Sequence, residues 1–175
     1  VEALKKTFMS QDGNYIFELR TSQINYWKVK VGRSIRFPTQ EGYNSLQDIY
    51  LTADPGKVIL RYYSSFGLYD LEKEQMLYHQ ELDKIHDLIL NQAKTELVGS
   101  VNERWIVKWN ISTGMLLNQL QLPVKLNTIA VSADGQLLAG IKEERNNDSI
   151  QVWNFVSGEL VTAFERPGQY IEGGW

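Results

Sequence analysis

The sequence predicts an all-β protein built from four four-stranded antiparallel units. Short runs of alternating apolar and polar residues fill most of the chain, and helical periodicity is weak almost everywhere. An aromatic residue recurs in these runs at Trp27, Tyr69, Trp109 and Trp153, with separations of 42, 40 and 44 residues. A repeat of about forty residues made of short strands is typical of a β-propeller blade.

Each unit begins with two apolar runs joined by a tight turn. The first run ends in a small polar residue, at Ser10, Thr52, Asn91 and Ser132. The turn that follows contains Asp-Gly at 12–13 and 134–135, and Asp-Pro-Gly at 54–56. Because Asp accepts local backbone hydrogen bonds and Gly tolerates positive φ, these residues predict reversals between antiparallel strands.

A third run carries the repeated aromatic residue, and a fourth, weaker run follows a second turn. The four units span about 1–41, 42–83, 84–123 and 124–166, within a single propeller region over 1–175. Only the stretch 72–85 has a spacing compatible with a helix. Its place at the end of a unit favours a strand followed by a linker.

These repeats resemble those of the WD-repeat β-propeller family over the whole chain. Trp153-Asn154 and Trp109-Asn110 are similar to the family's Trp-Asp dipeptide, with Asn for Asp. Tyr69-Asp70 has Tyr for Trp, and Trp27-Lys28 departs further. The segment VSADGQLLAG, 131–140, is very similar to the family's inner strands, whereas the Gly-His dipeptide that opens a typical repeat is missing. The resemblance implies a rigid scaffold that docks partners with its loops.

Four units are fewer than the six to eight blades usual in this family, so we expect an incomplete ring. Residues 167–175 are interpreted as a linker into a missing blade. Three explanations stay open: blades supplied by a longer chain, a second copy that closes the ring, or four blades that close on themselves. The last is least favoured, because four-bladed propellers of the hemopexin type latch their ends with a disulfide and this chain has no Cys.

Composition excludes several classes of function. The absence of Cys excludes disulfides, thiolate metal sites and cysteine catalysis, and it fits a cytoplasmic location. The net charge of −3 argues against nucleic acid as the main partner, because such binding is largely electrostatic. No stretch approaches the roughly 20 apolar residues of a membrane-spanning helix.

No motif for catalysis or phosphate binding is present, so the chain is expected to be non-enzymatic, without cofactor or metal. One cluster, HQELDKIHD at 79–87, has residue types that ligate zinc or manganese. A solvated linker is the favoured interpretation, because a metal site needs convergent ligands. The alternative function is a ligand or metal site in the central channel.

A basic run from Arg20 to Arg36 contains Lys28 and Lys30, with no acidic residue between its ends. A solvated outer strand is the favoured interpretation, since charged runs are usually exposed surface. The alternative is binding of an anionic ligand, RNA or phosphoinositide, through this strand.

The leading functional hypothesis is a protein-interaction scaffold, a docking or sensor module of a larger signalling or assembly protein. In the WD-repeat architecture that these repeats resemble, partners commonly dock on the face lined by the loops between the second and third strands and by those between blades. Tyr and Arg are frequent at interface hot spots. The candidate partner-binding residues are Tyr62, Tyr63, Arg104, Glu144, Arg145 and Asn146.

Overall fold

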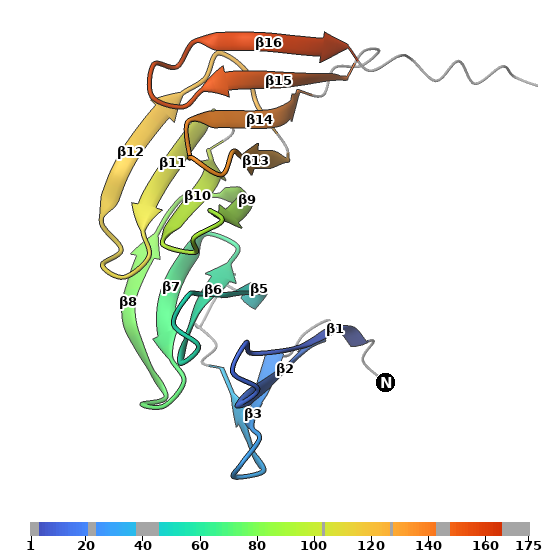
Figure 1. The fold of residues 1–175 in the computed structure, drawn as a ribbon, viewed down its shortest axis with the longest axis vertical. Helices are drawn as coiled ribbons and strands as arrows, with labels where there is room; N and C mark the ends of the chain where they lie inside the picture. The colour runs from blue at the N-terminus through green and yellow to red at the C-terminus, as the bar shows by residue number, and fades with distance from the viewer. Residues whose placement is uncertain are drawn as a thin grey trace, which may run out of the picture. The chain divides into compact units, whose positions relative to one another are not determined.

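The computed structural model describes residues 4–20, 24–37, 46–102, 104–126, 128–142 and 148–165. These residues form sixteen strands in four four-stranded antiparallel sheets (Figure 1), which confirms the predicted fold class. No helix in this part of the chain is long and apolar enough to cross a membrane. The predicted linker, 167–175, lies outside the described residues.

Each sheet is a simple meander in which consecutive strands pair. The first sheet contains β1 (Leu4–Met9), β2 (Tyr15–Arg20), β3 (Ile24–Lys28) and β4 (Arg33–Arg36). The second contains β5 (Leu46–Leu51), β6 (Lys57–Tyr62), β7 (Ser65–Asp70) and β8 (Gln75–Glu81). The third contains β9 (Ile85–Leu90), β10 (Glu96–Val101), β11 (Trp105–Asn110) and β12 (Leu116–Gln121). The fourth contains β13 (Ile129–Val131), β14 (Leu137–Lys142), β15 (Ser149–Asn154) and β16 (Leu160–Glu165). The ambiguous stretch 72–85 therefore holds a turn, the strand β8 and a linker, as predicted.

The turn between the first two strands of a sheet is held by its small polar residue. The Ser132 hydroxyl donates to Asp134 Oδ1 at 2.5 Å and accepts from the Leu137 amide at 2.9 Å. Gly135 follows with φ of 71°, a conformation that glycine adopts without steric cost. Ser10 repeats the arrangement in the first sheet, 2.6 Å from Asp12 Oδ1. The turn chemistry predicted from Asp-Gly is confirmed.

The repeated Trp-Asn dipeptide combines a core residue with a turn residue. The side-chain oxygen of Asn154 accepts the amides of Val156 and Ser157, each at 2.9 Å, where β15 turns into β16. Asp70 accepts the two corresponding amides between β7 and β8. Trp153 beside Asn154 is only 5% exposed. In the second and fourth sheets, the aromatic residue is therefore buried and the polar residue after it accepts the amides of the turn.

The chain forms two compact units. The first contains residues 1–84 with the segment 111–114, and the second contains 85–110 with 115–175. We call the face of a sheet that carries the repeated aromatic residue its leading face, and the opposite face its trailing face. Within each unit, the trailing face of the earlier sheet packs against the leading face of the later sheet.

The core of the first unit is rich in aromatic rings. Its buried residues are Tyr15, Phe17, Leu19, Tyr26, Phe37, Ile49, Val58, Leu60, Tyr62, Tyr69 and Leu71. Tyr26 and Phe37 lie 4.7 Å apart between ring centroids, and Tyr69 meets Phe37 edge-on at 5.2 Å. Offset and edge-on contacts of this kind add to the burial of apolar area.

The core of the second unit is mainly aliphatic. Its buried residues are Val98, Ile106, Leu122, Leu126, Ile129, Leu138, Trp153 and Phe155. Gly140 in β14 lets Leu126 approach closely, since a Cβ at Gly140 would lie 2.6 Å from Leu126 Cδ1. The missing side chain is therefore a condition for this packing.

Candidate functional site

The turns between second and third strands expose two predicted partner residues. Tyr63 lies in the β6–β7 turn and its side chain is 48% exposed. Arg104 lies in the equivalent β10–β11 turn and is also exposed. Backbone bonds tie each turn to the chain that follows the same sheet: the Leu82 amide donates to Ser64 at 2.7 Å, and the Leu122 amide donates to Arg104 at 2.8 Å. Both turns are thus anchored at their bases.

Tyr62 corrects one expectation. Its side chain was expected to face a partner, but it is 1% exposed and lies in the core of the first unit. The reason is that β6 extends through Tyr62, and the alternation of the strand turns this side chain to the leading face. Burial raises the pKa of Tyr62 to about 12. The other three candidates, Glu144, Arg145 and Asn146, lie outside the described residues.

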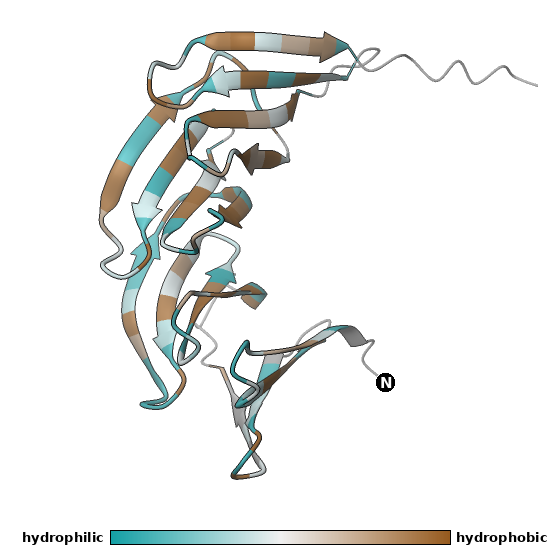
Figure 2. Cartoon of the chain, in the orientation of Figure 1, coloured by the Kyte–Doolittle hydropathy of each residue, from teal (hydrophilic) through white to brown (hydrophobic). Residues whose placement is uncertain are grey.

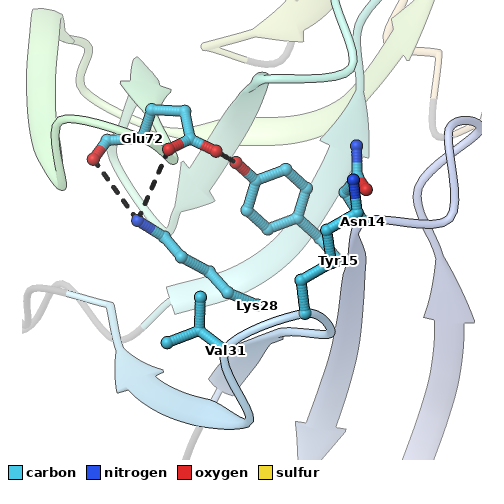
Figure 3. Close-up of a pocket in the computed structure, with 6 residues that line it drawn as sticks. Asn14, Tyr15, Lys28, Val31 and Glu72 are labelled. Carbon is cyan, nitrogen blue, oxygen red and sulfur yellow. Dashed lines mark hydrogen bonds and ion pairs between the residues drawn. The ribbon is translucent and has the colours of Figure 1, made fainter.

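A small pocket of about 270 Å³ lies in the first unit, at the ends of the strands that are opposite to the β6–β7 turn (Figure 3). It is lined by Asn14, Tyr15, Lys28, Lys30, Val31 and Glu72. The β1–β2 turn, the β3–β4 turn and the β7–β8 turn contribute to its wall. The pocket therefore depends on the packing of two sheets.

Charges of both signs meet in this pocket. The Lys28 ammonium lies 3.4 Å from Glu74 Oε1 and 3.8 Å from Glu72 Oε2, and it donates to the Glu72 carbonyl at 3.3 Å. The Tyr15 hydroxyl donates to the Glu72 carboxylate. Burial and the bond to Glu72 raise the pKa of Tyr15 above its ordinary value. Glu72 is thus held by a phenol and a cation while most of its side chain remains in solvent.

The basic run is only partly an exposed strand. Lys28 ends β3 with two carboxylates beside it, and Lys30 is exposed in the following turn rather than on the strand. Arg20 pairs with Glu18 at 2.5 Å. These pairs compensate the positive charge of Arg20 and Lys28 within the run.

The pocket was missed at the level of sequence. Tyr15 and Glu72 are 57 residues apart, and neither belongs to a motif. Their only common signal is that each lies at a turn on the same end of a repeat unit. That signal places them at one end of neighbouring sheets without predicting their contact.

The cluster of His and acidic residues at 79–87 does not converge on a common point. Among the described residues, no group of three or more His, Asp or Glu side chains is placed to hold a metal ion. Asp87 instead accepts the Leu88 amide at 2.9 Å and the Ile129 amide at 3.0 Å. It therefore links β9 to β13 within the second unit.

Comparisons with known proteins place the fold and leave the family open. No protein-family model matches the sequence, and no curated protein matches it. Among solved structures, the Cps50 (Swd1) β-propeller domain of Myceliophteria thermophila is similar with a TM-score of 0.71 and 16% identity, over 95% of this chain and 60% of that one. Hydrazine synthase of Kuenenia stuttgartiensis is similar with a TM-score of 0.69 and 13% identity, over 91% of this chain and 48% of that one.

The sheets are β-propeller blades. At these identities the similarity concerns the fold alone. The chain spans about half to three-fifths of the length of the two solved chains. The activity, substrates and partners of those longer proteins are therefore not transferred to it.

Proposed function

We propose that this chain is a non-enzymatic protein-interaction scaffold of the WD-repeat type, a docking or sensor module of a larger cytoplasmic protein. Its partner is a protein or peptide that contacts the turns between second and third strands. In this proposal, Tyr63 and Arg104 contribute directly, and Glu144, Arg145 and Asn146 extend the contact surface. Tyr62 supports it from within the core.

One observation carries the proposal: equivalent turns in two different sheets expose an aromatic and a guanidinium side chain on anchored backbones. Tyr63 is half exposed beside the buried Tyr62, and Arg104 is exposed beside Val101, which is 4% exposed. An anchored turn loses little conformational freedom when a partner binds, which favours affinity. Tyr and Arg are also the residue types that most often dominate binding energy.

Site-specific photo-cross-linking in extract of the source cells tests this proposal. A benzophenone amino acid is placed at position 63 or 104, and in a matched control at Gln92, which is exposed in the β9–β10 turn at the other end of its sheet. We expect positions 63 and 104 to capture the same discrete protein, and position 92 to capture little of it.

Substitution sharpens the test. Arg104→Ala should reduce capture from position 63, and Tyr63→Ala should reduce capture from position 104, each by about tenfold as for a hot-spot residue. Equal capture from all three positions would contradict the proposal. A substrate conversion by the full protein that is lost on changing one acid or His of this chain would also contradict it.

A further inference from the structure

Figure 2 shows hydrophobic residues in β14, β15 and β16 of the fourth sheet. Among the described residues, the trailing face of this sheet is apolar and its largest side chains are exposed. Ile150 lies opposite both Ile141 and Phe164, so the three side chains share this face. Leu137 is 40% exposed, Ile150 46% and Phe164 56%. The alternation of the strands places these residues on the face: Leu137, Ala139, Ile141, Ile150, Val152, Thr162 and Phe164. A continuous apolar face of this kind marks an interaction surface.

The equivalent face of the third sheet shows what such a surface accommodates. Val98 in the third sheet corresponds to Ala139 in the fourth when residues are counted from the first turn of each sheet. Ile106 corresponds to Ile150, because their partners across the strand pair, Ser100 and Ile141, are equivalent. Val98 is fully buried and Ile106 is 1% exposed, because the leading face of the fourth sheet covers them. The chain therefore already uses one trailing face as an interface with a leading face.

Polar anchors accompany that internal interface. Lys108 on the trailing face of the third sheet lies 4.8 Å above the Phe155 ring, and its ammonium donates to the Gly135 carbonyl at 3.5 Å. Asn118 donates to the Phe155 carbonyl at 3.0 Å. The corresponding residues of the fourth sheet are Val152 and Thr162. The uncovered face thus has fewer polar groups to desolvate than the covered one.

The matching half of an interface lies on the first sheet. Ile16 pairs with Trp27 and Met9, as Leu138 pairs with Trp153 and Val131 in the fourth sheet. Met9 is 54% exposed, and Ile16 and Trp27 are half-buried, whereas Leu138 is fully buried. This leading face has an apolar half near the β1–β2 turn.

The other half of the same face is polar but compensated. Glu18 stands where Gly140 stands in the fourth sheet, and Arg20 pairs with it at 2.5 Å. Asn25 lies opposite Glu18 in β3. Covering this half buries a paired carboxylate rather than an isolated one, which costs much less.

We propose that the occupant of the trailing face of the fourth sheet is the leading face of the first sheet of a second copy of this chain. One chain carries both halves of the interface type that it uses internally, and both halves are uncovered among the residues that the structure describes. The pairing is head-to-tail: Phe164 and Ile150 of one copy meet Trp27 and Met9 of the next. This surface is separate from the turns of the proposed function, so either proposal can fail alone.

Native mass over a wide range of protein concentration tests the proposal, measured by light scattering and sedimentation. We expect concentration-dependent association of the unaltered chain. Phe164→Asp and Met9→Asp should each weaken it by about a hundredfold, since each places a charge in an apolar contact. Leu117→Asp and Val31→Asp are matched controls, at exposed apolar residues that lie away from the two faces, and they should leave association unchanged.

Mixing the two interface variants gives the decisive result. The Phe164→Asp chain keeps its leading face, and the Met9→Asp chain keeps its trailing face, so together they should form a discrete heterodimer that neither forms alone. A monomer at every concentration would overturn the proposal. Association that survives both variants, or a mixture that forms no heterodimer, would overturn it as well. Circular dichroism spectra and thermal unfolding matching those of the unaltered chain establish that each variant is folded.

Discussion

The two compact units use the same strand pairing but fill the space between their sheets differently. The first unit places Tyr15, Phe17 and Tyr26 of one sheet against Tyr69 of the next. The second unit places Val98 and aliphatic neighbours against two large rings, Trp153 and Phe155. The same strand pairing is therefore compatible with very different side chains between the sheets.

Glycine occupies one member of an equivalent cross-strand pair in each unit. In the first unit Leu60 faces Gly67 across β6 and β7, and a Cβ at Gly67 would lie 2.6 Å from the Tyr78 carbonyl oxygen. In the second unit the equivalent pair is Gly140 and Gln151, with the small residue on the earlier strand. One member of each pair is small, and the strand that carries it differs.

Alkaline pH should produce the largest difference in stability between the two units, because it should destabilise the first unit more than the second. Burial is the main cause that raises the pKa of Tyr15, Tyr26, Tyr62, Tyr69 and Tyr78, all in the first unit, with Tyr62 and Tyr78 at about 12. Unfolded tyrosine ionises near 10. Their stabilisation of the folded state is therefore complete below pH 10 and is lost as the pH rises toward and beyond 12.

Conservative variants measure this effect. We expect Tyr62→Phe to raise the pH midpoint of alkaline unfolding, followed by far-ultraviolet circular dichroism, because it removes one phenol that must ionise. Tyr63→Phe, at an exposed tyrosine in the next position, should leave the midpoint unchanged. An unchanged midpoint in both variants would show that the buried phenols do not govern unfolding.

Overpacking at Gly140 should be the next largest effect. Gly140→Ala places a methyl group 2.6 Å from Leu126 Cδ1 and should lower the free energy of unfolding by about 1–3 kcal/mol, measured by urea titration. Leu126→Ala made together with Gly140→Ala should recover part of this loss, because it frees the contested space. Purely additive losses would show that Leu126 is not the cause.

The turn after the third strand should have a smaller effect. Asn154→Ala removes the acceptor of two backbone amides and should cost about 1 kcal/mol. Asp70→Ala should cost more, because Asp70 is 7% exposed and lies 3.7 Å from the Lys73 ammonium. Asp70→Asn should retain most of the stability in the same urea titration. An equal loss in Asp70→Asn would assign the effect to charge rather than to the turn.

Acidic pH should have the smallest effect, and it should again be larger in the first unit. Hydrogen bonds from Ser10, Lys57 and Ser132 hold the pKa of Asp12, Asp54 and Asp134, respectively, below the ordinary value of 3.8. Stability from these carboxylates is present above that value and is lost as the pH falls through their lower folded values.

Hydrogen exchange of individual peptides at decreasing pH measures this difference. The first unit contains Asp12 and Asp54 and should lose protection earlier than the second, which contains Asp134. Asp134→Asn should abolish the acid sensitivity of the β13–β14 hairpin and leave the β1–β2 hairpin unchanged. The reverse order of the two units would contradict the assignment.

Much of the fold was predictable because its signals are local. Ser132, Asp134 and Gly135 contact one another within a few residues, so their order in the chain predicts a turn. The same holds for Asn154, whose partners follow it directly. The candidate site was less predictable. The side chain of Tyr62 was expected at the surface, whereas it is buried. The reason is that β6 continues through residue 62, and the position of the strand end decides which way this side chain points.

The amino-acid sequence by itself determined the all-β class, the four repeated units and the residues of their turns, because strand alternation and turn chemistry depend on near neighbours. Only the tertiary structure decided which faces are covered: Val98 on the trailing face of the third sheet is buried, whereas Phe164 on the trailing face of the fourth sheet is exposed. It also decided which distant groups meet, such as Tyr15 and Glu72. The physical reason is that burial depends on what packs against a face. The repeated sequence produces similar apolar faces in every sheet, and it does not determine which of these faces packs against another sheet.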